Sequence, residues 1–217
     1  LYTAYLPLYN GVEKVEFGVP KGTVFKPIAP RKEKPIVFYG TSIMHGACAS
    51  RPGMSISALI GRRYDLPTIN LGFSGNGRLE LEVGKYLAQL DPAVYCIDCL
   101  PNLTSPQVGE RAEPLVNQLR EAHPETPIVL VEDRTYTNAP FFASSRKRHA
   151  ASRKELRSTF EKLKAVGDKN LYYLEGDIQL GDDGEAATDG SHPNDLGFMR
   201  YADAYATVLD PLLKPTS

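Results

Sequence analysis

From Pro35 onward, short apolar segments alternate with amphipathic ones, and this alternation limits the possible folds more than any other feature of the chain. The apolar segments have the length and character of parallel strands that are buried on both faces. The predicted strands cover residues 36–39, 68–70, 93–97, 128–131 and 171–174. Between and after them, apolar residues recur at helical spacing in residues 79–90, 108–119, 156–163 and 199–213. We therefore predict an α/β fold: a doubly wound, flavodoxin-like three-layer sandwich with a parallel sheet of about five strands.

Residues 1–34 differ from the rest of the chain. Aromatic and β-branched residues flank a turn signal at Asn10-Gly11, which predicts a hairpin or two short strands. Prolines then interrupt the chain up to the first strand, as in a linker. We interpret this short N-terminal β segment as the remnant of a preceding β-sandwich module or as a strap on the main domain, residues 35–217.

The net charge of the chain and its first residue indicate which partners and which cellular location to expect. The formal net charge of −1 argues against a nucleic-acid partner, and no apolar run approaches the roughly 18 residues of a membrane span. The chain begins with Leu1 rather than Met, which favours a processed, periplasmic or secreted protein over a cytoplasmic one. The histidines are scattered and lack ligand spacing, so we expect neither a metal nor another cofactor. The oligomeric state is left open.

In a doubly wound sheet, ligands bind at the carboxyl ends of the strands. The first loop at that edge places Ser42 directly after a strand, in Gly40-Thr41-Ser42. A serine hydroxyl becomes a nucleophile when a base accepts its proton, although a serine here also fits a plain turn or a helix N-cap.

The base for such a serine at neutral pH is a histidine. His45 shares the turn of Ser42 and has no acidic residue close by in sequence. His192 follows Asp189 by three residues, so this aspartate can accept a proton from one imidazole nitrogen and turn the other toward the serine. The alternative is that Asp189-Gly190 forms only a turn and that His192 only begins a helix.

Two further loops offer hydrogen-bond donors. Residues 72–77 have a GxxGxG order, which is a weak phosphate-binding signal and better suits a backbone N–H aimed at an oxyanion. Asn102 follows a proline in the next loop. Its amide is a second candidate donor, although an asparagine after proline is often just a turn residue.

Together these residues resemble the SGNH, or GDSL-type, hydrolase superfamily over roughly residues 35–213. Block I matches Gly40-Thr41-Ser42, block II matches Gly75, block III matches Asn102, and the DxxH of block V matches Asp189 and His192. The resemblance implies a Ser42–His192–Asp189 triad. It also implies an oxyanion hole made by the N–H groups of Ser42 and Gly75 and the amide of Asn102.

Two positions depart from the family pattern. Thr41 replaces the usual aspartate before the nucleophile, and Leu103 replaces the aspartate that commonly follows the block III asparagine. The first does not exclude activity, whereas the second puts the orientation of the Asn102 amide in doubt. The proline-rich lead-in is similar to the end of the β-sandwich module that precedes the catalytic domain in some bacterial carbohydrate esterases of this superfamily.

The resemblance therefore implies a serine ester hydrolase that removes a short acyl group, above all acetyl, from a small-molecule or oligosaccharide ester. The alternatives are a lysophospholipase or thioesterase for longer acyl chains, and a ligand-binding relative without turnover.

Three residues are candidates for substrate binding. Arg51 is suited to hold a carboxylate of the substrate or an acidic side chain of the protein. Tyr136 and Phe141 lie in a long loop, 132–146, and either wall a pocket or pin that loop to the domain. The basic residues that follow, from Arg146 through His149 to Arg157, predict a solvated helix face.

Overall fold

The computed structural model describes residues 2–213 and contains one parallel sheet with the strand order β2-β1-β3-β4-β5. Its strands are β1 (Ile36–Gly40), β2 (Thr68–Gly72), β3 (Val94–Asp98), β4 (Ile128–Val131) and β5 (Leu171–Leu174). Each strand starts within one residue of its predicted start, because five short apolar runs supply the buried centre of the sheet. The predicted parallel sheet is confirmed.

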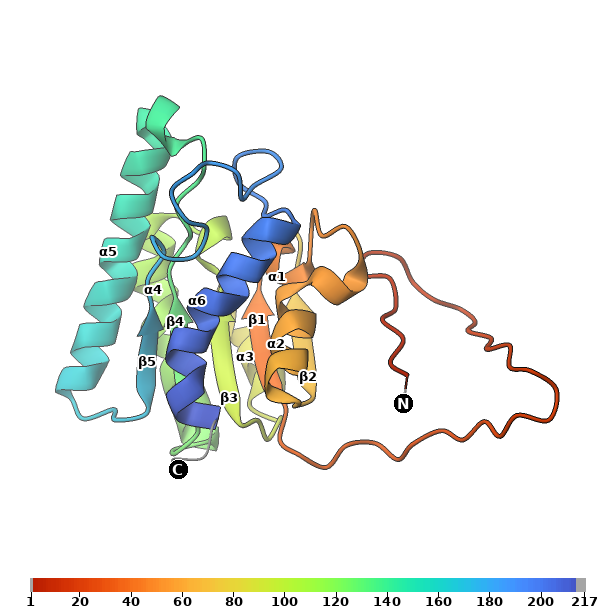
Figure 1. Ribbon diagram of the computed structural model, residues 1–217. Coiled ribbons are helices and arrows are strands. Elements are labelled where there is room, and N and C mark those ends of the chain that lie inside the picture. The colour runs from red at the N-terminus through yellow and green to blue at the C-terminus, as the bar shows by residue number, and fades with distance from the viewer. Residues whose placement is uncertain (1, 214–217) are drawn as a thin grey trace.

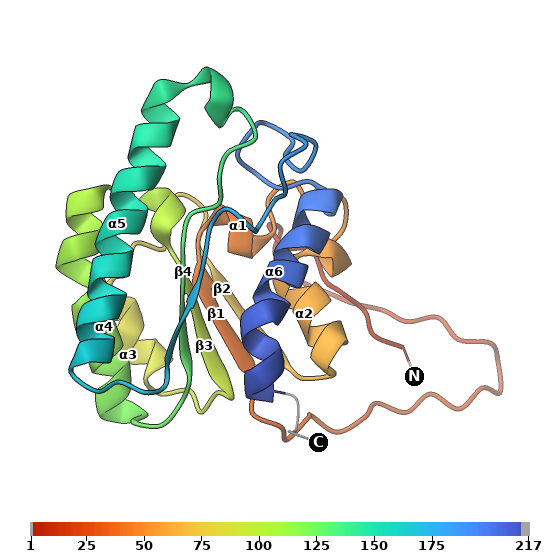
Figure 2. The same cartoon turned by 60° about the vertical axis from the view of Figure 1, so that its left-hand side comes forward.

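Helices cover both faces of the sheet and make three layers (Figures 1 and 2). One face carries α1 (Ser42–His45), α2 (Ile56–Tyr64) and α6 (Asp195–Leu213), and the other carries α3 (Leu81–Leu87), α4 (Ser105–Ala122) and α5 (Ala143–Ala165). Side chains of β1 alternate between the two apolar cores: Val37 faces α3 and α4, and Phe38 faces α6. The doubly wound sandwich is thus confirmed. None of its described helices is both long and apolar enough to cross a membrane.

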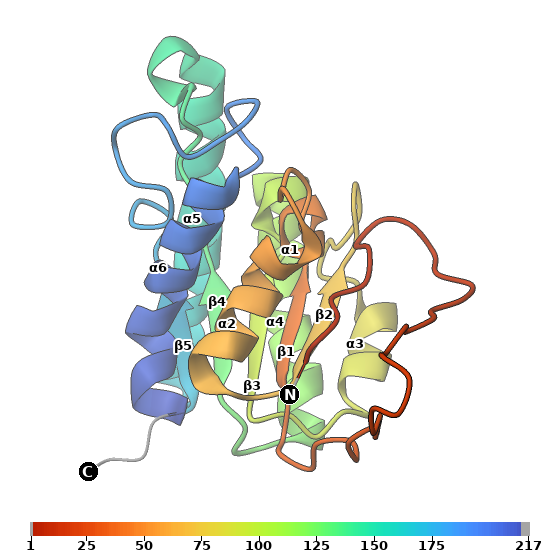
Figure 3. The same ribbon diagram turned by 45° about the vertical axis from the view of Figure 1, so that its right-hand side comes forward.

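Residues 2–35, the described part of the N-terminal segment, differ from the sequence expectation. Residues 2–35 contain no helix and no strand, so the N-terminal hairpin is not formed. An isolated two-stranded hairpin is marginal in water, and here its apolar side chains have no sheet or core to cover: Phe17 is 61% exposed. Residues 5–10, which we call the strap, lie against α1, and the chain then arcs away before it returns to β1 (Figures 1 and 3). A preceding β module stays a prediction.

Asp98, the last residue of β3, is a buried carboxylate beneath the loops at the carboxyl edge. Its Oδ2 accepts hydrogen bonds from the hydroxyls of Tyr201 (2.6 Å) and Tyr205 (2.9 Å), whereas its Oδ1 has no hydrogen-bond partner. Burial raises the pKa of Asp98 to about 6, and the two tyrosine hydroxyls only partly offset that effect. Among the charged groups nearby, Arg134 lowers this pKa and Asp133 raises it further.

We expect Asp98 to make stability fall as the pH rises. Its folded pKa lies above the unfolded value, so the folded state keeps a proton that the unfolded chain has released between about pH 4 and pH 6. The loss amounts to about 3 kcal/mol once both states are ionised, at about 1.4 kcal/mol for each unit. The free energy of unfolding of Asp98→Asn, measured in urea, should therefore rise by about 3 kcal/mol relative to that of the unsubstituted protein as the pH goes from 4 to 7. A difference that does not change with pH would contradict this account.

Candidate active site

The loops that follow β1, β2 and β3 meet at the carboxyl edge of the sheet. β1 lies between β2 and β3, and the chain reverses its winding there, so this edge is the topological switch point. Gly40 ends β1 at a close approach, since a Cβ on it would lie 2.8 Å from the carbonyl oxygen of Asp98 and 2.7 Å from Cβ of Met44. Only glycine lets α1 begin directly at the end of the strand.

Ser42 is the first residue of α1. Thr41 caps this helix, and its side-chain oxygen accepts the N–H of Ile43 at 3.3 Å. An aspartate at this position would supply the same kind of acceptor, so Thr41 retains the capping role. The N–H of Ser42 lies in the first turn, where a helix has no internal acceptor for it. It is therefore available to a ligand.

Three side chains form a continuous hydrogen-bonded row at this edge. Ser42 Oγ lies 2.9 Å from His192 Nε2, although the two residues are 150 positions apart, and His192 Nδ1 lies 2.7 Å from Asp189 Oδ2. The other oxygen of Asp189 accepts the backbone N–H groups of Ser191 (2.9 Å) and His192 (2.7 Å). Partial burial raises the pKa of Asp189, but the hydrogen bonds from His192 and Ser191 outweigh that effect and bring the pKa to about 2. Asp189 is thus ionised at neutral pH beside the imidazole.

The loops that hold Gly75 and Asn102 contact each other next to this row. Phe73 donates its N–H to the carbonyl of Gly40 at 2.9 Å, which binds the β2 loop to the end of β1. Gly75 has φ +73°, a conformation that favours glycine. The side-chain amide of Asn102 donates to the carbonyl of Asn76, so a contact other than an aspartate at position 103 orients this amide.

Arg134, which the sequence does not single out as a site residue, is hydrogen-bonded to the loop between Asp189 and His192. It is 1% exposed and donates from Nε to the carbonyl of Ser191 (2.8 Å) and from its terminal nitrogen to Ser191 Oγ (2.7 Å). Its charge is paired with Asp133 at 2.6 Å. The available signal was the run Glu132-Asp133-Arg134: three charged residues directly after an apolar strand are an unusual sequence for a buried edge.

The start of α5 differs from the predicted solvated face. His149 is only 4% exposed, and its ring meets Tyr136 edge-on with centroids 4.3 Å apart. Arg153 is largely buried too and donates to the carbonyl of Asp133 at 2.7 Å. This part of the prediction is wrong, because the charged loop after β4 folds beneath the helix and supplies partners that periodicity does not reveal.

The three substrate-binding candidates do not gather in one place. The guanidinium of Arg51 lies 3.4 Å from Asp195, so an acidic side chain of the protein is its partner, although 66% of the arginine side chain is exposed. Tyr136 packs against His149 and Arg134. Phe141 is 83% exposed and therefore does not pin the loop to the domain.

Comparison with known proteins places this geometry in context. The sequence model of the GDSL-like lipase/acylhydrolase family matches residues 33–210. A crystal structure of a protein from Bacteroides ovatus described as a GDSL-like lipase is 38% identical, with a TM-score of 0.80, over 84% of this chain and 54% of that one. None of the curated proteins matches the chain.

Two more distant structures share the fold. One is a family two carbohydrate esterase from Clostridium thermocellum in complex with cellohexaose, with 16% identity and a TM-score of 0.67 over 86% of this chain and 67% of that one. The other is a two-domain esterase active on acetylated mannans, with 20% identity and a TM-score of 0.65 over 85% of this chain and 50% of that one. The chain thus spans about half the length of the Bacteroides protein and of the mannan esterase.

Proposed function

The chain belongs to the GDSL-like lipase/acylhydrolase family. From that premise we propose that it is an ester hydrolase, with Ser42 as its nucleophile and His192 as its general base. The observation that supports this most directly is the row of hydrogen bonds from Ser42 Oγ through His192 to Asp189, with lengths of 2.9 and 2.7 Å. Asp189 fixes the imidazole tautomer and stabilises the imidazolium that forms during the reaction.

In the first half of the proposed reaction, His192 Nε2 accepts the hydroxyl proton as Ser42 Oγ attacks the ester carbonyl carbon. The negative charge that develops on the carbonyl oxygen is stabilised by the N–H groups of Ser42 and Gly75 and by the Asn102 amide. The bond to the leaving oxygen then breaks, and His192 returns its proton to the alcohol. An acyl group remains on Ser42.

In the second half, a water molecule gives its proton to His192 and attacks the acyl carbon. The same donors stabilise the oxyanion, the bond to Ser42 Oγ breaks, and His192 returns the proton to the serine. The carboxylic acid is released and the free enzyme is restored. The chain's own groups therefore account for every proton in the cycle.

Arg134 is a positioning residue in this proposal, because it holds Ser191, which lies in the chain between Asp189 and His192. Arg134→Lys keeps a cation beside Asp133 but loses the two-pronged contact with Ser191. We expect kcat to fall by about 100-fold, the effect of a displacement of about 1 Å at the reacting groups, with little change in KM. The measurement is steady-state kinetics on an aryl acetate. Ser191→Ala removes only the hydroxyl acceptor and should lose less; a loss confined to KM would contradict the positioning role.

We further propose that the substrate is a carbohydrate bearing short acyl groups, above all acetyl. Backbone contacts close the space between the loops: a Cβ on Gly77 would lie 2.1 Å from the carbonyl oxygen of Gly40, and one on Gly72 would lie 2.1 Å from the nitrogen of His45. The end of β2 and the loop after it therefore pack tightly against the end of β1 and the start of α1. The carbohydrate esterase that shares the fold supports a sugar substrate by analogy.

Chain-length dependence tests this proposal. Acetyl and propionyl aryl esters should be cleaved at least about tenfold faster, as kcat/KM, than octanoyl esters, because a site for acetyl groups gains no binding energy from the further methylenes of a long acyl chain. Acetate should also be released from acetylated manno- and xylo-oligosaccharides. A rate that rises steadily with chain length would favour a lysophospholipase or thioesterase instead.

A further inference from the structure

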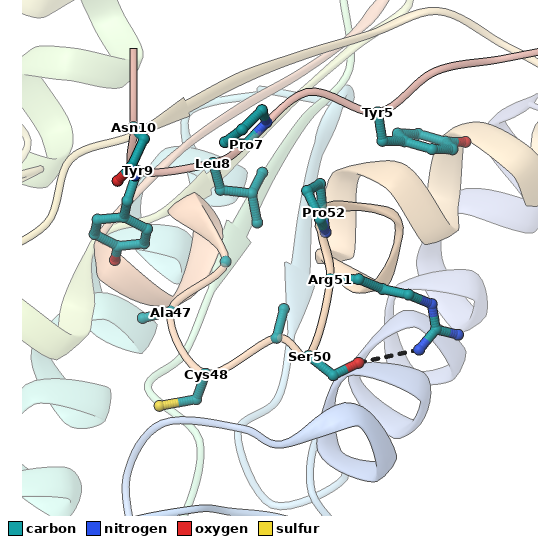
Figure 4. Close-up of a pocket in the computed structure, with 12 residues that line it drawn as sticks. Tyr5, Pro7, Leu8, Tyr9, Asn10, Ala47, Cys48, Ser50, Arg51 and Pro52 are labelled. Carbon is teal, nitrogen blue, oxygen red and sulfur yellow. Dashed lines mark hydrogen bonds between the residues drawn. The ribbon is translucent and has the colours of Figure 1, made fainter. Parts of the chain in front are cut away.

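Next to the turn of Ser42, an open cavity of about 540 Å³ lies between the strap and the loop 46–52 (Figure 4). The strap forms one wall, with Tyr5, Leu8, Tyr9 and Asn10, and the loop from Gly46 to Pro52 forms the other. The cavity has the size of small-ligand sites in proteins. None of the residues proposed for the triad or for the oxyanion donors Gly75 and Asn102 lines it.

The strap wall is fixed to α1 by several specific contacts. The imidazole of His45 hydrogen-bonds through Nε2 to the carbonyl of Leu8 at 2.5 Å, and its ring stacks on Tyr9 with centroids 4.0 Å apart. The side chain of Leu8 fills the space over Gly46, where a Cβ would lie 2.4 Å from Leu8 Cδ1. The strap therefore docks as a defined wall even though it has no secondary structure.

The opposite wall is bound to the element that follows His192. Ser50 donates its N–H (2.9 Å) and its hydroxyl (2.5 Å) to Asp195, the first residue of α6. At the other end of the cavity, the N–H groups of Gly46 (3.0 Å) and Ala47 (2.9 Å) both donate to the carbonyl of Ser42. The cavity thus extends directly from the turn of the nucleophile, between two walls that are each held in place.

The exposed groups on these walls combine aromatic faces with hydrogen-bonding side chains. Tyr5 and Tyr9 are each about half exposed, four residues apart on an extended segment, so their separation is at most roughly 14 Å. Asn10, Ser50 and the exposed guanidinium of Arg51 add donors and acceptors along the same groove. Ser50 and Arg51 keep their contacts with Asp195 whatever binds, but an acyl chain offers no hydrogen bond to the Asn10 amide or to the exposed part of the Arg51 guanidinium. A pyranose ring packs its C–H face on a tyrosine and pairs its hydroxyls with these groups.

We infer that this cavity is a subsite for the sugar residues next to the acylated one, which it holds between the strap and the loop 46–52. The inference rests on the proposed function, because it assumes that the ester belongs to an oligosaccharide. It adds that the strap, rather than the α/β domain alone, selects a glycan chain over a small acetate ester.

The test compares two substrates in each variant of the full chain. The measured quantity is kcat/KM for an acetylated xylo- or manno-tetrasaccharide divided by kcat/KM for an aryl acetate. This ratio should fall about tenfold in Tyr5→Ala and by less in Asn10→Ala. Tyr86→Ala, which removes an exposed tyrosine on α3, is the matched control and should leave the ratio unchanged. Equal losses on both substrates, or a selective loss on an octanoyl ester, would overturn the subsite.

A second measurement involves no bond cleavage. At least one of the unacetylated sugars xylotetraose, mannotetraose and cellotetraose should inhibit aryl acetate hydrolysis competitively. Tyr5→Ala should raise the inhibition constant of that sugar about tenfold. If none of the three inhibits at millimolar concentration, the subsite is wrong. The proposed function fails separately, if the protein cleaves aryl acetates but releases no acetate from any acetylated oligosaccharide.

Discussion

Ser42→Ala lowers the kcat for ester hydrolysis by about a million-fold, the loss expected when a triad nucleophile is removed. The hydroxyl interacts with His192, whereas the turn is held by the Thr41 cap and the N–H groups of Gly46 and Ala47, none of which the substitution removes. The free energy of unfolding should therefore change by no more than about 0.5 kcal/mol. Stopped-flow and long end-point assays on an aryl acetate measure the rate, and urea unfolding measures the stability.

Ser74→Ala is the matched control, because Ser74 lies in the neighbouring loop after β2. It should keep its rate within a few-fold. If Ser42→Ala retained the rate of the unsubstituted protein, the chain would need a different nucleophile, and the roles proposed for His192 and Asn102 would lose their basis. The family membership would stand, since it rests on residues 33–210 as a whole.

The elements that the sequence predicts best are those whose side chains meet the same environment along their whole length. β4 lies inside the sheet, between β3 and β5, and its sequence Ile-Val-Leu-Val contains only apolar residues, which predicts its burial on both faces. α2 is not predicted because it has only nine residues, too few to repeat a helical apolar pattern, and two arginines, Arg62 and Arg63, lie in its last turn. Its burial depends on α6, which lies far away in the sequence.

The site shows the same division between local and distant information. Asp189 and His192 lie in one loop, so their spacing alone predicts their contact, and Ser42 follows a recognisable strand. Arg134 is different, because its partner Ser191 lies 57 residues away and only the fold brings the two together. The strap is a third case. Its tyrosines suit a β hairpin equally well, and only the contact with His45 distinguishes the two outcomes.

The second large effect separates the two histidines that lie near Ser42. His192→Ala should lose about as much kcat as Ser42→Ala, because nucleophile and base act as one unit. His45 is closer in sequence, but its Nε2 lies 2.5 Å from the carbonyl of Leu8 and its ring stacks on Tyr9. These contacts hold Nε2 of His45 at the strap, and the hydrogen-bond partner of Ser42 Oγ is His192 rather than either nitrogen of His45. His45→Ala should therefore stay within about tenfold of the unsubstituted rate on a small ester, where the strap matters least.

Asp189→Asn should fall between these two variants, about 10,000-fold down, because an amide favours the wrong imidazole tautomer. The order of kcat on one aryl acetate at pH 8 is then His45→Ala, Asp189→Asn, His192→Ala, from fastest to slowest. At that pH the carboxylate of Asp189, with its pKa of about 2, is ionised in the unsubstituted protein, so the asparagine variant reports the loss of an ionised partner. If His45→Ala were the slowest of the three, the base would have to approach Ser42 from the strap side, and the hydrogen-bonded row through His192 would be a structural contact only.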